Sequence, residues 1–106
     1  MRIPSQGELT AMRSSNYESI LKQHVESGDR QRVMDYVRMI FRTDSYAAFY
    51  AVMTTRDRES IEYVSERLMQ SPDYSDWGRA GAGFMKLGEE ERVIEARDKI
   101  RKHFGW

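Results

Sequence analysis

The residue types that most often carry catalysis or bind metals are scarce in this sequence. It contains two histidines, His24 and His103, and no cysteine among its 106 residues. The lack of cysteine excludes disulfides, thiolate zinc sites and a cysteine nucleophile. Neither histidine belongs to a metalloprotease motif, and no phosphate-binding, dinucleotide-binding or calcium-binding motif is found. We therefore expect a protein that is not an enzyme and that uses no cofactor and no metal ion.

Arginine is the second residue type that could define a function, because guanidinium groups bind nucleic-acid phosphates. Arg30, Arg38 and Arg42 are the candidate nucleic-acid face, and Arg38 and Arg42 share one stripe of a predicted helix. However, 17 basic residues are balanced by 17 acidic ones, so no net charge attracts a polyanion. A regulator that binds nucleic acid is therefore an alternative hypothesis, and a solvated face of ion pairs is the default.

The elements that position these side chains are predicted to be helices. Apolar residues at spacings of three and four mark one face of a helix. That pattern occupies Tyr17, Ile20, Leu21, His24 and Val25, and it returns 60 positions later at Trp77, Ala80, Gly81, Phe84 and Met85. The following helices keep the same relation, from Val33, Val37, Ile40 and Phe41 to Val93, Arg97, Ile100 and Arg101. A third copy begins at Ser45.

The connectors between the helices repeat as well. The segments SGDRQRV, TRDRESI and LGEEERV each place an acidic residue before a helix, where it caps or stabilises the first turn. Short connectors of this kind make neighbouring helices antiparallel. The sequence therefore predicts three helical hairpins, at residues 16–42, 45–70 and 75–104. They form one all-α domain over residues 15–106, after an N-terminal segment 1–14 that could contain a short helix.

Two stretches need an explanation beyond helix formation. Gly78, Gly81 and Gly83 fall within one predicted helix, where each glycine costs about 1 kcal/mol relative to alanine. Gly81 lies on the inward face, so we expect its small size to serve packing, whereas the sequence gives no account of Gly83. The stretch YAAFYAVM at residues 46–53 is apolar all round. It is either the most buried helix or one with a second face for a partner.

A known repeat family shares part of this pattern. Trp77, Ala80, Gly81, Phe84 and Gly88 stand in the order W-x2-A-G-x2-F-x3-G, which resembles the first helix and turn of a tetratricopeptide repeat. The sequence departs from the family pattern at Ala80, Val93 and Arg97, and packing like that of HEAT repeats is the alternative. The resemblance implies a short right-handed solenoid with a groove lined by the first helix of each hairpin. The groove residues it implies are Lys22, Val25, Tyr46, Tyr50, Met53, Met85 and Lys86.

The function implied by the resemblance is protein binding. The protein would be an adaptor or a small chaperone that holds a helical or extended segment of another protein in the groove. Self-association through the apolar middle helix and the glycine-rich helix is a third hypothesis. The sequence has no run of about 18 apolar residues that could span a membrane and no secretory signal. We therefore expect a cytoplasmic protein with no membrane contact.

Overall fold

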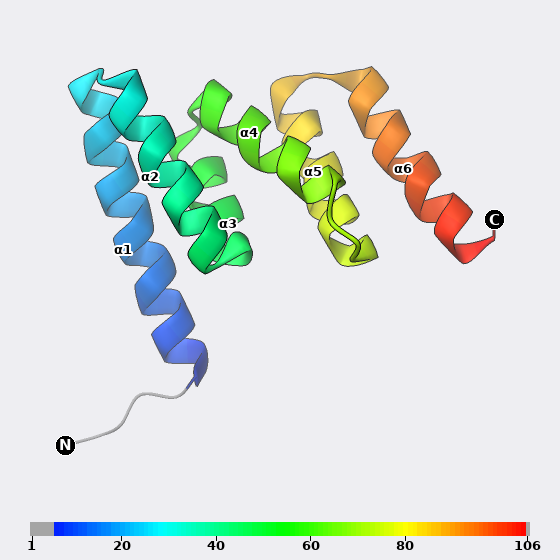
Figure 1. Cartoon of the computed structure of the whole chain (residues 1–106), viewed down its shortest axis with the longest axis horizontal. Coiled ribbons are helices and arrows are strands. Elements are labelled where there is room, and N and C mark those ends of the chain that lie inside the picture. The colour runs from blue at the N-terminus through cyan, green and yellow to red at the C-terminus, as the bar shows by residue number, and fades with distance from the viewer. Residues whose placement is uncertain (1–5, 106) are drawn as a thin grey trace. The chain divides into compact units, whose positions relative to one another are not determined.

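The computed structural model describes the backbone of residues 6–105 and the side chains of residues 16–105. Over these residues the chain forms six α-helices and no strand (Figure 1). The helices are α1 Gln6–Ser27, α2 Arg30–Thr43, α3 Ser45–Thr55, α4 Arg58–Met69, α5 Tyr74–Leu87 and α6 Glu90–Phe104. The all-α class is therefore confirmed for the described part of the chain. The stacking of the helices as a solenoid stays a prediction.

The chain divides into two compact units, Met1–Asp57 and Arg58–Trp106. The first unit contains α1, α2 and α3, and the second contains α4, α5 and α6. The division falls one residue after Arg56, the C-cap of α3, which takes a left-handed conformation with φ 59°. That conformation is uncommon for a residue with a side chain, and it ends the helix at this point.

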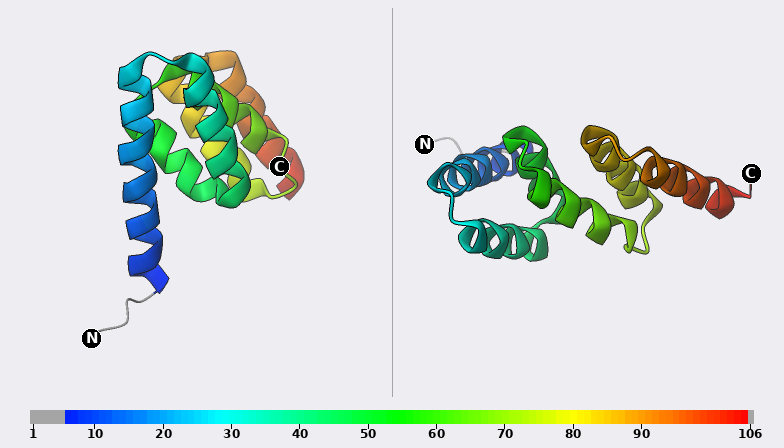
Figure 2. Two further views of the ribbon diagram at one scale, coloured as in Figure 1. Left: turned by 60° about the vertical axis from the view of Figure 1, so that its left-hand side comes forward. Right: turned by 90° about the horizontal axis from the view of Figure 1, so that it is seen from above.

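In the first unit, α3 packs against both α1 and α2 (Figure 2). The buried residues of the three helices are Leu21, Val33, Met34, Val37, Ile40, Ala47, Ala48, Ala51 and Val52. The alanines lie on one face of α3, where their short side chains allow close packing. The opposite face carries Tyr46 and Tyr50, which are 41% and 43% exposed. The middle helix therefore has one core face and one exposed aromatic face.

The turn between α1 and α2 has an acidic residue before the second helix, as the sequence predicts, and a glycine at the end of the first. Gly28 takes a left-handed conformation with φ 79°, which suits a residue without a side chain. Asp29 is the N-cap of α2, and its carboxylate accepts a hydrogen bond from the backbone N–H of Arg32 at 3.1 Å. Arg30 then reaches Asp57 through two hydrogen bonds of 2.8 Å each. The start of α2 is thus tied to the chain that follows α3.

The first helix is longer than predicted. The prediction separates a segment 1–14 from a helix that starts at residue 16, whereas α1 begins at Gln6 and runs without interruption to Ser27. Glu8, Leu9, Ala11 and Met12 are good helix formers, and no proline follows Pro4 in this stretch, so nothing ends the helix before residue 16. Residues 1–5 of the predicted segment lie outside the described residues.

In the second unit, α5 lies between α4 and α6 (Figure 1). The core of the second unit is apolar. It includes Ile61, Val64, Leu68, Trp77, Ala80, Phe84 and Ala96. Two serines of α4, Ser60 and Ser65, are also buried. A small polar residue at Ser65 reflects how closely α5 approaches α4 at this point.

Gly83 is the residue that permits this approach. A Cβ atom added to Gly83 would lie 1.9 Å from Ser65 Oγ and 3.1 Å from Ser65 Cβ. The same atom at Gly81 would lie 3.5 Å from Ala96 Cβ, an ordinary contact, and at Gly78 it would meet nothing within 4 Å. Gly81 therefore does lie on the inward face, beside Ala96 of α6, but it is not the glycine at the tightest contact. The tightest contact is at Gly83, because this residue faces α4 and not α6.

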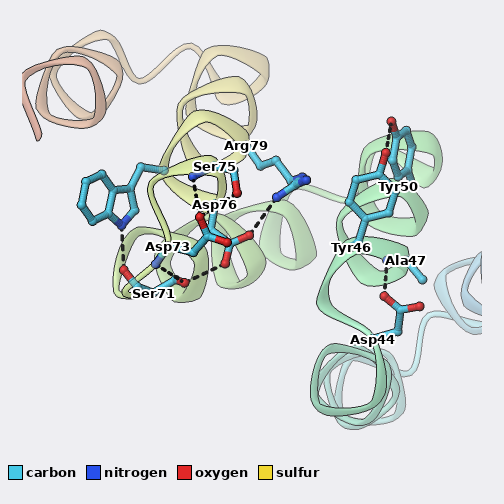
Figure 3. Close-up of polar contacts among 10 residues, drawn as sticks. Asp44, Tyr46, Ala47, Tyr50, Ser71, Asp73, Ser75, Asp76 and Arg79 are labelled. Atoms are coloured by element: carbon cyan, nitrogen blue, oxygen red, sulfur yellow. Dashed lines mark hydrogen bonds and ion pairs between the residues drawn. The ribbon is translucent and has the colours of Figure 1, made fainter. Parts of the chain in front are cut away.

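A polar turn fixes the start of α5 (Figure 3). The Asp73 carboxylate accepts hydrogen bonds from the Ser75 backbone N–H at 3.0 Å and from the Ser75 hydroxyl at 2.8 Å. The Ser71 hydroxyl donates to Asp76 at 2.7 Å, and the Ser71 carbonyl accepts from Trp77 Nε1 at 2.7 Å. These contacts anchor both the helix start and the ring that lies at its first buried position.

The Asp73 cap predicts a pH-dependent contribution to stability. Hydrogen bonds from the backbone and the side chain of Ser75 lower the pKa of Asp73 below its ordinary value. Because the folded pKa is lower than the unfolded one, the cap stabilises fully above the unfolded pKa. The stabilisation is lost as the pH falls through the folded pKa. Asp73→Asn keeps a good N-cap but removes the titrating group.

We therefore expect the urea midpoint of the native protein to fall more than that of Asp73→Asn between about pH 5 and about pH 2. Circular dichroism during urea denaturation measures both midpoints. The other carboxylates are common to the two proteins, so they cancel in the comparison. If the urea midpoints of the two proteins fall equally as the pH is lowered, the Asp73 carboxylate does not stabilise the folded state in the way described.

Candidate functional site

An apolar channel with a volume of about 420 Å³ lies between α5 and α6. Its walls are Trp77, Gly78, Gly81, Ala82 and Met85 from α5, and Val93, Ala96, Arg97, Ile100 and Arg101 from α6. The two arginines are the only charged residues among them. Volumes of this size are typical of binding sites in proteins. The walls cover about two turns of each helix, which is enough to accommodate about two turns of a bound helix.

The 60-residue repeat relates this channel to a groove that is filled in the first unit. The corresponding pairs are Leu21 and Gly81, Val33 and Val93, Val37 and Arg97, and Ile40 and Ile100. The four residues of the first unit are fully buried, and α3 packs against the two helices that carry them. In the second unit, no helix among the described residues of that unit covers the corresponding walls, which line an open channel. The channel therefore has the register of a groove for a helix.

Charged residues of opposite sign mark the two ends of the channel. At one end, Met85 and Val93 continue into a smaller recess of about 390 Å³, whose walls include Glu89, Glu90 and Ile94. At the other end lie Arg97 and Arg101. Met85 is 68% exposed and Ile94 is 46% exposed, which is high for apolar side chains. An occupant would therefore bury apolar surface between an acidic and a basic end.

Two contacts between basic side chains of α6 and aromatic rings of α5 hold the helices that form the channel. Lys99 Nζ lies 4.6 Å from the centre of the Trp77 ring and donates a hydrogen bond to the Met69 carbonyl at 2.8 Å. The Arg92 guanidinium lies 4.7 Å from the centre of the Phe84 ring. These cation–π contacts fix α6 against α5. The walls are therefore positioned before any occupant arrives.

Arg92 is also part of an ion-pair network. Its guanidinium donates hydrogen bonds to Glu66 of α4 and to Glu95 of α6. Partial burial lowers the pKa of Arg92, but the hydrogen bonds and negative charges of Glu66 and Glu95 outweigh this effect, so the pKa is raised overall. Arg92 therefore links α4 to α6.

The predicted groove residues fall into two groups. Lys22, Val25, Tyr46, Tyr50 and Met53 belong to the first unit, and Met85 and Lys86 belong to the second. Of these, Lys22 and Lys86 are exposed, and Val25 and Met53 are half-buried. The Tyr46 and Tyr50 hydroxyls form a hydrogen bond of 3.1 Å, and their rings lie 4.8 Å apart (Figure 3). Of the whole set, Met85 is the residue that lines the channel.

The candidate nucleic-acid face consists largely of paired charges. Arg30 binds Asp57, and Arg38 lies 3.4 Å from Asp35 one turn earlier in α2. Arg42 lies in the last turn of α2, where a cation stabilises the helix end. Carboxylates beside two of the three arginines reduce their attraction for phosphates. The arrangement is typical of a solvated ion-paired face.

Both histidines lie among aromatic rings. His24 is 5.2 Å from the ring of Tyr36, and burial raises the pKa of Tyr36, with a smaller contribution from the charge of Tyr17. His103 stacks on Tyr74 at 5.3 Å. Among the described residues, no three histidine, aspartate or glutamate side chains come together in a way that could hold a metal ion. The histidines therefore serve packing in this structure.

Sequence analysis did not identify the α6 wall of the channel as a surface. The sequence pattern assigns four residues of this wall to the repeat, but not to a surface: Val93, Arg97, Ile100 and Arg101. The signal that could have found them is the change of type within the repeat, from Val37 to Arg97 and from Phe41 to Arg101. A charged residue at a position that is apolar in another copy indicates a surface that opens to solvent or to a partner.

Comparison of the chain with models of known protein families finds no match, and no curated protein or solved structure matches it. The resemblance to tetratricopeptide repeats therefore stays a prediction. None of the helices in the described part of the chain is long and apolar enough to cross a membrane.

Proposed function

We propose that the protein is a non-enzymatic interaction module that holds a helix of another protein chain in the channel between α5 and α6. The observation that carries this proposal is the repeat relation between the channel and the groove of α1 and α2, which α3 covers. Helix-in-groove binding is a common mode of protein recognition. An adaptor or a small chaperone would act in this way.

The chemistry of the channel defines the helix that it would hold. Small residues at Gly78, Gly81 and Ala82 let a helix backbone come close, as the alanines of α3 do in the first unit. Arg97 and Arg101 replace apolar residues of the first hairpin, so the bound helix should carry carboxylates beside its apolar face. The expected ligand is an amphipathic helix with a face of alanine and leucine and with acidic flanks.

Tyr36, Asp73 and Arg92, whose pKa values are shifted, lie on different elements, and none of them lines the channel. Active sites usually gather such groups in one cleft. The walls of the channel offer apolar contact and two guanidinium groups but no nucleophile with a neighbouring base. This composition supports binding over catalysis.

The proposal predicts selective binding of a synthetic helix. A labelled peptide with an alanine and leucine face and glutamate flanks should bind the native protein. The same peptide with lysine flanks should bind at least about tenfold more weakly, because lysines would face Arg97 and Arg101. Fluorescence anisotropy measures the affinities. The methyl NMR signal of Met85, assigned through Met85→Leu, should shift when the acidic peptide binds.

Variants of α5 test where the peptide binds. Ala82→Glu places a charge on the wall of the channel at an exposed helix position, so it should abolish binding while helicity is kept. Lys86→Ala, on the same helix but outside the channel walls, should bind as the native protein does. Equal affinity of native protein and Ala82→Glu would show that the channel is not the binding site.

A further inference from the structure

The geometry of α5 and α6 points to a second copy of this chain as the partner that covers the channel walls. This inference rests on the proposed function, because it names the protein chain that the channel holds. The two copies would pair through α5, with the two α5 helices antiparallel and related by a two-fold axis. The same surface then serves both copies, and the assembly closes as a dimer.

The exposed face of α5 carries both a projection and a depression. Met85 is 68% exposed, whereas Gly78 has open space around its Cα. They are seven residues apart, or about two helical turns, so they lie on the same face. A two-fold axis at the level between Gly81 and Ala82 places Met85 of each copy opposite Gly78 of the other, because both lie equally far from that level. A flexible methionine side chain fills such a depression well.

The same axis brings opposite charges together on α6. Gly81 lies beside Ala96, since an added Cβ would be 3.5 Å from Ala96 Cβ. The helices α5 and α6 are antiparallel, so the level of the axis crosses α6 between Glu95 and Ala96. Glu90 and Arg101 lie equally far from that level on opposite sides. Each Glu90 would therefore lie at the level of Arg101 of the second copy.

The two charges are available for this pairing. Glu90 and Arg101 are both exposed, and each borders the channel or its acidic end. Within the part of the chain that the structure describes, neither has an ion pair in its own chain. The exposed Ile94 would lie at the level of Arg97 of the second copy, whose methylene groups can cover it. Two hairpins joined in this way form an antiparallel four-helix bundle, a common stable arrangement.

Exchange of the two charges tests this arrangement with the intact chain. Sedimentation equilibrium should show a reversible dimer for the native protein. In Glu90→Arg and in Arg101→Glu, two attractive pairs become repulsive in every dimer, so the dimer should dissociate about tenfold more readily. An equimolar mixture of the two variants should recover association, because each substituted side chain then faces an opposite charge on the other variant. The double variant Glu90→Arg with Arg101→Glu should also associate as the native protein does.

Matched controls separate this pairing from general charge effects. Glu91→Arg and Lys102→Glu make the same charge changes on α6 at exposed positions outside the channel walls, and they should leave the dimer unchanged. Ala82→Glu should give a monomer. Recovery in the mixture of Glu90→Arg and Arg101→Glu, together with an unchanged dimer in the two control variants, is the result that the antiparallel arrangement predicts.

Several outcomes would overturn the inference. A native chain that stays monomeric at every accessible concentration would overturn it, as would a dimer that Ala82→Glu and the charge variants do not affect. The acidic peptide distinguishes these failures from failure of the proposed function. If the peptide binds a monomeric native chain and not Ala82→Glu, the channel holds a helix of a different protein. If the peptide does not bind a monomeric chain either, the proposed function fails as well.

Discussion

Replacement of Gly83 by leucine is expected to lower the free energy of unfolding by about 3 kcal/mol or more. Even the first atom of the new side chain would lie 1.9 Å from Ser65 Oγ and 3.1 Å from Ser65 Cβ. Rotation of the serine could relieve the contact with Oγ, but the contact with Cβ requires movement of α4 itself. Both residues are buried, so the additional atoms have no solvent to enter.

A series of glycine replacements in α5 separates close packing from helix propensity. Gly83→Ala should destabilise, although less than Gly83→Leu, because about 1 kcal/mol of improved helix propensity offsets part of the overpacking. Gly78→Ala makes the same change where nothing lies within 4 Å, so it should stabilise by up to about 1 kcal/mol. Urea denaturation followed by far-ultraviolet circular dichroism measures all three. Equal effects of Gly83→Ala and Gly78→Ala would contradict the described contact between α4 and α5.

The sequence predicts the helices, but it does not predict the role of Gly83. The number of helices and most of their boundaries follow from periodicity and from capping residues such as Asp29 and Gly28, because these signals are local. The role of Gly83 depends on Ser65, which lies 18 positions away in another helix. Nothing in the sequence near Gly83 contains that information. The contact appears only when α4 and α5 are placed side by side.

The candidate site was predictable to a similar extent. The repeat identified the residues of both helices of the third hairpin, and Met85 was predicted to contact a partner. However, the expected groove ran along the first helices of all the hairpins, whereas the channel lies between the two helices of one hairpin. Which side of an amphipathic helix stays uncovered depends on its neighbours, and the sequence of that helix does not fix it. That Arg97 and Arg101 line a channel together with Gly78 and Ala82 is therefore known only from the structure.

Truncation of Phe84 to alanine should lower the free energy of unfolding by about 3–5 kcal/mol. Phe84 is fully buried in α5, and its ring lies under the Arg92 guanidinium at 4.7 Å. The variant would leave a cavity and would remove the ring against which Arg92 packs. Arg92 also binds Glu66 and Glu95, so its displacement would weaken the link between α4 and α6. The same denaturation measurement gives the change in free energy.

Phe104→Ala provides the matched control for this prediction, because it removes the same side chain at a position that is 47% exposed near the end of α6. It should change the free energy of unfolding by no more than about 1 kcal/mol. Phe84→Leu should fall between the two, since it keeps most of the apolar contact and loses the aromatic face. Such an ordering would identify Phe84 as the centre of the second unit, from which both walls of the channel take their positions. Similar losses for Phe84→Ala and Phe104→Ala would instead indicate that the Phe84 ring does not hold α6 against α5, and that the channel is not a preformed site.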